Sequence, residues 1–346
     1  MGRMKELSVL AQGRGRWVDA TRRVPCPICG ATSWCGMSPD GAVVLCKRVE
    51  GKHHGVTRDG VTYYLHRLDS PVSQAAVTPS FVIARERASD DVCDRAYRVL
   101  LGQLGLDPVD REMLAGRGFA TDDIEEIGYR TLPVRGRARL AKVVVDAVGE
   151  AVASQVPGVV WRTADDGSGR GWWSVAGCPG VLVPVRNIEG KIVAMKVRRR
   201  DLGEGGPRYL YVSSARHGGP SAVNAVHVPR RALDLRPHAT RLVLTEGEVK
   251  ADLSTALLGE PVASVPGVGA WRAGLDLAKQ WRPPLIVIAY DTDASKNPVV
   301  ARHRRDLREA LERDGFRAAV WTWSDAWKGL DDFLVARRRS EVCRDK

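Results

Sequence analysis

Two short apolar runs that end in acidic residues constrain the fold of this chain more than any other feature of its sequence. They are Leu242-Val-Leu-Thr-Glu-Gly-Glu248 and Leu285-Ile-Val-Ile-Ala-Tyr-Asp-Thr-Asp293. Both are rich in β-branched residues, which is typical of strands buried on both faces of a parallel sheet. Because parallel strands share one carboxyl-terminal edge, we expect the acids that follow them to meet there.

The segment between the two runs predicts the rest of an α/β unit. Residues 249–258 place apolar side chains on one helical face, and residues 261–265 form another short apolar strand. The order strand, helix, strand, helix, strand then brings Glu246, Asp291 and Asp293 to one edge of the sheet. Carboxylate oxygens are hard ligands that suit Mg²⁺ or Mn²⁺.

These motifs resemble the Toprim domain, which bacterial-type primases, topoisomerases and some nucleases share. Three further motifs extend the resemblance: Gly247-Glu-Val-Lys-Ala251, Ser264-Val-Pro-Gly-Val-Gly-Ala-Trp271 and Trp327-Lys-Gly-Leu-Asp-Asp-Phe-Leu334. Together they are most similar to the Toprim-like domain of replication proteins from phages, plasmids and integrated elements. The resemblance implies that the three carboxylates form a catalytic site that holds a divalent metal ion.

The chain departs from the family pattern at one position of this implied site. Replicative primases of bacteria usually carry a further acid four residues after the Toprim glutamate, and this chain has Lys250 there. Asp331, with Asp332 beside it, could supply the missing metal ligand instead. Lys250 would then act at the catalytic site by neutralising phosphate charge, and a role for Glu248 as a second ligand stays open.

Four of the seven cysteines lie close together near the amino terminus. The unit Pro25-Cys-Pro-Ile-Cys-Gly30 is a zinc knuckle, in which a tight turn directs two thiolates at one ion. A predicted hairpin with its turn near residues 39–41 returns the chain to this knuckle. His53 or His54, in a loop-like segment, could replace Cys35 as the fourth ligand. The expected site for structural Zn²⁺ consists of Cys26, Cys29, Cys35 and Cys46.

The segment between the zinc site and the Toprim motifs predicts helices followed by a basic hairpin. Helices are expected at residues 88–105, 107–118 and 119–127, the last capped by Thr121. Two strands joined by a turn at residues 187–190 follow. This order resembles the amino-terminal half of the bacterial primase catalytic core, although a solvated charge run on an edge strand is the alternative. The residues expected to contact nucleic acid or nucleotide are Arg198, Arg199, Arg200, Arg208 and Tyr209.

The overall charge favours a polyanionic partner. The chain of 346 residues carries a formal net charge of +12 and has a sequence pI near 9.6. Its apolar runs are too short to cross a bilayer, and its first residues lack the apolar core of a signal peptide, so we expect a cytoplasmic protein without a membrane partner. Clustered cysteines in such a reducing compartment favour metal binding over disulfides.

We therefore predict an α/β protein in which a Toprim-type parallel sheet flanked by helices follows a mixed α+β basic subdomain and an amino-terminal β zinc ribbon. The expected divisions are a zinc ribbon at 1–68, a linker at 69–85, a helical collar with the basic primase-core subdomain at 86–238, and a Toprim catalytic domain at 239–346.

The predicted activity is that of a DNA primase in the replication of a phage, plasmid or other mobile element. It would use nucleoside triphosphates, a single-stranded DNA template and Mg²⁺ or Mn²⁺. The sequence lacks a phosphate-binding P-loop, so a replicative helicase would be a separate polypeptide. A Toprim nuclease and a non-catalytic nucleic-acid-binding replication factor are the alternatives.

Overall fold

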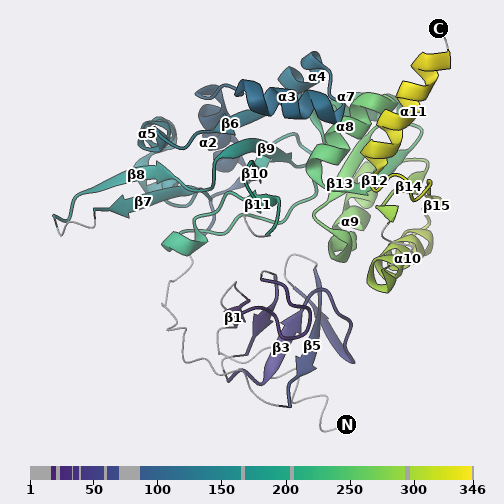
Figure 1. Cartoon of the computed structure of the whole chain (residues 1–346), viewed down its shortest axis with the longest axis horizontal. Coiled ribbons are helices and arrows are strands. Elements are labelled where there is room, and N and C mark those ends of the chain that lie inside the picture. The colour runs from purple at the N-terminus through teal and green to yellow at the C-terminus, as the bar shows by residue number, and fades with distance from the viewer. Residues whose placement is uncertain are drawn as a thin grey trace.

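The computed structural model describes residues 17–20, 24–32, 34–38, 40–57, 61–69, 86–164, 168–202, 206–292 and 297–344. They form an amino-terminal β ribbon, a mixed subdomain and a carboxyl-terminal α/β domain, which run from purple to yellow in Figure 1. The predicted fold class is confirmed. Asp293 and residues 70–85 of the predicted linker lie outside the described residues. Within the ranges above, the helices are too short or too polar to span a bilayer.

The ribbon is a five-stranded antiparallel sheet ordered β1-β2-β3-β5-β4. Its strands are β1 (Val18–Asp19), β2 (Gly36–Met37), β3 (Val43–Cys46), β4 (His53–Val56) and β5 (Thr62–Arg67). The predicted hairpin is confirmed, since Gly36 pairs with Leu45 across β2 and β3. Buried cysteines, with Met37 and Val44, form most of its small core, so the ribbon has little apolar surface to stabilise it without a metal.

The loop predicted around His53 and His54 is wrong, because both residues belong to β4 and pair with β5. The prediction relied on the glycines that flank them. Gly55 lies within the strand, where an added Cβ would come 2.5 Å from the hydroxyl of Tyr63. The glycine therefore makes room for a cross-strand aromatic ring and does not mark a turn.

The mixed subdomain is built on a four-stranded antiparallel sheet ordered β11-β10-β9-β6. The strands are β6 (Arg130–Leu132), β9 (Gly180–Arg186), β10 (Ile192–Arg199) and β11 (Tyr209–Tyr211). Helices α2 (Asp90–Gly102) and α5 (Arg137–Val148) pack on the face that carries Leu182. Helices α3 (Pro108–Arg117) and α4 (Thr121–Ile127) pack on the opposite face, which carries Val181 and Val183. The remaining elements are α6 (Glu150–Ala153), β7 (Val159–Thr163), β8 (Gly171–Val175), η1 (Ala215–His217), α7 (Arg230–Leu235) and η2 (Arg236–His238).

The three helices and the strand pair expected from the sequence are present in this subdomain. The predicted cap of the third helix is wrong. Thr121 is the first residue of α4, and Ala120 occupies the N-cap position without a side-chain hydrogen bond. Helix α5 and the hairpin of β7 and β8 were not predicted.

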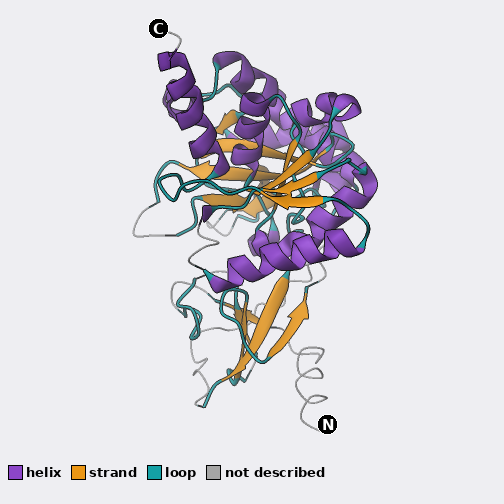
Figure 2. Cartoon of the chain, turned by 90° about the vertical axis from the view of Figure 1, so that its right-hand side faces the viewer, coloured by secondary structure: helices purple, strands orange, loops and turns teal. Residues whose placement is uncertain are grey.

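The carboxyl-terminal domain is a four-stranded parallel sheet ordered β13-β12-β14-β15, with helices on both faces (Figure 2). Its strands are β12 (Leu242–Glu246), β13 (Val262–Val265), β14 (Ile286–Ile288) and β15 (Ala318–Val320). Alternate residues of β12 face opposite helix layers: Val243 packs with α8 (Glu248–Leu258) and α11 (Leu330–Arg344), whereas Leu244 packs with α9 (Trp271–Trp281) and α10 (Pro298–Arg313). Asn297 caps α10 through its side chain, and Pro298 follows it at the first helical position.

A buried polar network joins the two sheets where α8 packs against β9. The hydroxyl of Tyr129 donates to Asp252 Oδ2 at 2.6 Å, and His227 Nε2 lies 3.1 Å from Asp252 Oδ1. The backbone N–H of Arg186, at the end of β9, donates to His227 Nδ1 at 3.1 Å. The side chains of Tyr129, His227 and Asp252 are almost fully buried, so each polar group depends on this network for its partners.

The ribbon lies against the α/β domain below both sheets in Figure 1. Glu50 forms an ion pair with Arg302 of α10, and Arg272 Nη1 of α9 donates to Thr62 Oγ1 at 3.4 Å. Val61 approaches Gly269 of η3 (Val268–Ala270), where its methyl group would lie 3.8 Å from an added Cβ. These contacts place the ribbon beside the carboxyl-terminal edge of the parallel sheet.

Candidate active site and zinc centre

Two carboxylates end neighbouring strands of the parallel sheet and face one pocket. Leu244 of β12 pairs with Ile288 of β14, so Glu246 and Asp291 emerge at the same edge. Gly247 follows Glu246 with a φ of 82°, a left-handed conformation that favours glycine and turns the chain directly into α8. The pocket has a volume of about 330 Å³, and both carboxylates line it. The predicted convergence of Glu246 and Asp291 is therefore present, whereas Asp293 lies outside the described residues.

Acids around this edge are paired with cations of the chain itself. Lys250 of α8, 11% exposed, forms an ion pair with Asp291. Lys196 Nζ of β10 lies 2.5 Å from Glu248 Oε1, and Arg117 Nη2 of α3 lies 2.8 Å from Asp331 Oδ2. Charges buried this deeply need such partners. Two of the three pairs cross from the mixed subdomain to the α/β domain.

Lys250 stands at the centre of this arrangement. A Cβ added to Gly329 would lie 3.2 Å from Lys250 Nζ and 2.5 Å from Asp331 Oδ1, so both groups approach the same glycine. Asp331 is 1% exposed and does not line the pocket. The ammonium of Lys250 thus occupies the region where the family pattern has an acid.

The pocket receives its remaining polar groups from the mixed subdomain. Lys196, Arg117 and Tyr209 line it together with the carboxylates. Arg117 Nη1 donates to the hydroxyl of Tyr209 at 3.2 Å, and Lys196 Nζ lies 4.6 Å from the centre of the Tyr211 ring. Lys196 alternates with Arg198 on β10, a period-two signal that could have identified it, whereas nothing local in the sequence distinguishes Arg117.

The predicted nucleic-acid residues divide into different environments. Tyr209 lies in the pocket, Arg208 is exposed, and the Nε of Arg198 is buried without a hydrogen-bond partner. Arg199 donates its backbone N–H to Arg208. The Arg200 guanidinium binds the acidic residues at the start of α3, with Nη2 2.7 Å from Asp110 Oδ2, so its charge is already compensated within the fold.

The donor set at the sheet edge suits a hard divalent cation, since Glu246 and Asp291 offer carboxylate oxygens to one pocket. Burial and, after it, the charge of Glu246 raise the pKa of the neighbouring Tyr290. Within the described part of the chain, a cluster of three or more metal-binding side chains occurs at the four cysteines but not here. A bound ion would have to compete with Lys250 for Asp291.

A second pocket, of about 220 Å³, lies between the ribbon and the sheet edge. The ribbon contributes Trp34, Lys47 and Arg48, and the α/β domain contributes Glu246 and residues 266–270. Lys47 Nζ lies 5.5 Å from the centre of the Trp34 ring. Glu246 therefore lines both pockets, and nothing local in the sequence distinguishes the three ribbon residues.

The zinc centre has the geometry that a tetrahedral ion requires. The sulfur atoms of Cys26, Cys29, Cys35 and Cys46 all lie within 4.8 Å of one another. The Sγ atoms are 3.7 Å apart for Cys29 and Cys35, and 3.9 Å for Cys35 and Cys46. A tetrahedron with Zn–S bonds of about 2.3 Å has sulfur atoms about 3.8 Å apart. The predicted ligand set, with Cys35 as its fourth member, therefore fits structural zinc.

Without a metal, the surroundings of Cys26 and Cys35 favour the protonated thiol over the thiolate. Burial raises the pKa of Cys26 to about 11, and the hydrogen bond with Cys46 together with burial raises the pKa of Cys35 to about 12. Cys46 also accepts backbone N–H groups, from Arg48 at 3.4 Å and from Val49 at 3.3 Å. Zinc binding would replace the protons of these buried thiols.

Comparisons with known proteins identify the fold. The profile of a protein family described as a domain of unknown function (DUF3854) matches residues 235–341, and the sequence matches no curated protein. The zinc-binding and RNA polymerase domains of the Aquifex aeolicus primase superpose with a TM-score of 0.54 at 12% identity, covering 98% of this chain and 81% of that one.

Two further solved structures agree. The RNA polymerase domain of Mycobacterium tuberculosis primase DnaG, in complex with double-stranded DNA, has a TM-score of 0.54 at 16% identity over 74% of this chain and 80% of that chain. A DnaG primase catalytic domain bound to single-stranded DNA has a TM-score of 0.51 at 17% identity over 74% and 77%. The chain therefore has the fold of the zinc-binding and catalytic domains of bacterial primases.

Proposed function

We propose that this chain is a DNA primase-type nucleotidyltransferase that extends primers on single-stranded DNA. One observation carries the proposal: the carboxylates of Glu246 and Asp291 line a single pocket together with Lys196, Arg117 and Tyr209 of the preceding subdomain. Acids that can hold a divalent ion and cations that can bind phosphate are thus supplied by two different parts of the fold. Structural neighbours described as bound to single-stranded or double-stranded DNA support the same assignment.

Glu246 and Asp291 would hold Mg²⁺ or Mn²⁺, with Asp293 as the further ligand predicted from the sequence. When bound, the ion would neutralise charge on the triphosphate of an incoming nucleotide. Lys196 and Arg117 stand across the pocket and would bind the same phosphates, which keeps the reacting groups in place. Lys250 would turn from Asp291 to phosphate when the ion binds.

The ribbon would present the template to this site. Trp34 is 46% exposed, and its ring can stack on a base, while Lys47 and Arg48 beside it can contact the strand backbone. All three share a pocket with Glu246. We further propose a setting in the cytoplasmic replication of a phage, plasmid or other mobile element, with a separate helicase.

Template-dependent incorporation of labelled ribonucleotides on single-stranded DNA tests the proposal. The Asp291→Asn variant should lose incorporation while keeping its fold and zinc content. Asp276→Asn is the matched control, because Asp276 is an exposed residue of α9 away from the pocket. Shortening of the DNA would instead assign the site to a nuclease, and binding without either reaction would assign the chain to the non-catalytic factors.

A further inference from the structure

An aromatic hairpin projects from the mixed subdomain at the end of the molecule opposite the α/β domain. It consists of β7 and β8, whose register pairs Trp161 with Trp173 and Arg162 with Trp172. Figure 1 shows the hairpin reaching away from the sheets. Trp161 is 50% exposed and Trp172 is 42% exposed. Exposing large aromatic side chains to water is energetically unfavourable, so a cluster of them often marks a binding surface.

Two of the three rings, those of Trp161 and Trp173, are held by contacts within the fold. Trp161 lies over Gly171, where an added Cβ would come 2.4 Å from its ring, so only glycine leaves room for this arrangement. The Trp161 and Trp173 rings meet edge to face with centres 5.3 Å apart and planes at 73°. Trp173 Nε1 in turn donates to Glu150 Oε1 at 3.2 Å. A rigid aromatic surface loses little conformational entropy when a ligand stacks on it.

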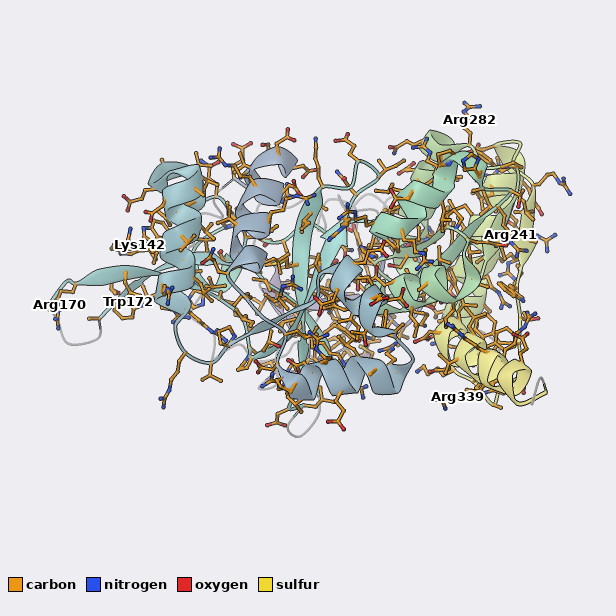
Figure 3. All side chains as sticks on the ribbon, turned by 90° about the horizontal axis from the view of Figure 1, so that it is seen from above. Lys142, Arg170, Trp172, Arg241, Arg282 and Arg339 are labelled. Carbon is orange, nitrogen blue, oxygen red and sulfur yellow. The ribbon has the colours of Figure 1, made fainter. Side chains whose placement is uncertain are left out.

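A groove of about 520 Å³ runs between this hairpin and α5. Its lining includes Trp161, Trp172 and Trp173 of the hairpin and Ala138, Arg139, Lys142 and Val145 of α5. Figure 3 shows Trp172, Arg170 and Lys142 together at this end of the molecule. The groove is open and far from the pocket that holds Glu246, so it is not part of the candidate active site.

The charges around the groove favour an anionic ligand. The acids that line it are engaged, because Asp146 pairs with Lys142 and Glu150 accepts from Trp173. Arg139 lines the groove, and Arg162 is the cross-strand partner of Trp172; both are exposed, and in the described part of the chain neither forms an ion pair. Exposed guanidinium groups beside exposed rings are the two elements by which proteins hold single-stranded nucleic acid. Asp165 and Asp166, between the strands, lie outside the described residues.

We propose that the hairpin and α5 form a second contact for single-stranded nucleic acid, with bases stacked on Trp161 and Trp172 and phosphates bound by Arg139 and Arg162. The site would hold a strand at a distance from the sheet edge and so anchor template outside the pocket. A protein partner is the competing occupant. Exposed arginines that form no ion pair within the described residues favour the polyanion, because they remain available to phosphate groups.

Fluorescence anisotropy of a labelled oligothymidylate, measured without nucleotides or Mg²⁺, tests the site independently of primer synthesis. Trp172→Ala should weaken binding by about fivefold or more, the loss expected for one stacked base. Trp172→Phe should retain most of the affinity, since a smaller ring can still stack. Arg162→Ala should reduce the slope of log affinity against log salt by about 0.7, the value for one phosphate on a single strand.

Arg339→Ala is the control for lost charge, because Arg339 is exposed on α11 at the opposite end of the molecule (Figure 3). It should leave affinity unchanged. Circular dichroism and thermal melting confirm that the Trp172 variants remain folded. If Trp172→Ala and Arg162→Ala bind the oligonucleotide with the parent affinity and salt slope, the proposal is overturned and the hairpin is better assigned to a protein partner. Because the readout is binding, a protein that fails to make primers can still pass this test.

Discussion

Removing the charge of Lys250 tests whether this side chain acts as the counter-ion of Asp291 at the sheet edge. The Lys250→Met variant keeps the aliphatic stem and leaves Asp291 without its partner in a site where the two side chains are 11% and 17% exposed. Two opposite charges 3–4 Å apart attract by about 4–5 kcal/mol at an effective dielectric constant of about 20. Loss of one member of a buried pair costs about 3–5 kcal/mol. Because neither side chain is fully buried, we expect the free energy of unfolding to fall by about 3 kcal/mol, the lower end of this range.

Urea unfolding with chelator and with Mg²⁺ measures this effect. In chelator, Lys250→Met should unfold at lower urea than the parent by the amount above. Mg²⁺ should restore more stability to the variant than it adds to the parent, since the ion no longer competes with an ammonium for Asp291. Lys279→Met is the matched control: its pair with Asp314 is 2.9 Å long but 50% and 33% exposed, so its removal should cost at most about 1 kcal/mol.

A double-mutant cycle of Lys250→Met and Asp291→Asn isolates the pair itself. The reasoning predicts a coupling free energy clearly above that of the control pair, and a double variant more stable than Lys250→Met alone. A coupling near zero, with Lys250→Met as stable as the parent in chelator, would refute the counter-ion role.

Two further predictions concern the ribbon and α10. Cys26→Ser should reduce the zinc content from one ion per chain to none, as measured by elemental analysis after purification without chelator. Cys178→Ser, which lies outside the cluster, should leave the zinc content unchanged. Parent protein without zinc would contradict the assignment. The pKa of His303 is lowered, chiefly by burial, so the unfolded chain binds its proton more readily than the folded one. Stability should therefore fall as pH drops below about 6.5, by up to about 1.4 kcal/mol per pH unit, and His303→Gln should flatten this slope in urea titrations at several pH values. Equal slopes in both proteins would show that His303 does not contribute.

The parts of the fold that the sequence predicts are those encoded locally. Strand β12 and its terminal acid follow from a short β-branched run, and the zinc knuckle follows from cysteine spacing. Helices α2 and α3 lie within residues 88–105 and 107–118, where helices were expected from the sequence. In each case one stretch of chain carries the whole signal, so no knowledge of distant residues is needed.

The parts that could not be predicted depend on contacts between distant segments. The acids that follow the strands were expected to await a metal, but Lys250 and Lys196 already neutralise two of them. Arg117 reaches Asp331 across more than two hundred positions of sequence, a pairing that only the folded chain creates. Arg200 is a residue type that often binds phosphate, yet here it forms an ion pair with Asp110 of α3. Residue type and spacing indicate which groups can do chemistry, whereas packing decides which of them are occupied.

The buried chain of hydrogen bonds from Tyr129 through Asp252 and His227 to the backbone of Arg186 has a mechanical consequence. If the mixed subdomain rotated away from the α/β domain, several buried polar groups would lose their hydrogen-bond partners at once. Each unsatisfied group would cost about 1–3 kcal/mol. We therefore expect the mixed subdomain and the α/β domain to move as one rigid body. The width of the space between Glu246 and Lys196 is then set when the chain folds, whereas the width of the second pocket beside Glu246 depends on the ribbon, which is held by a few surface contacts.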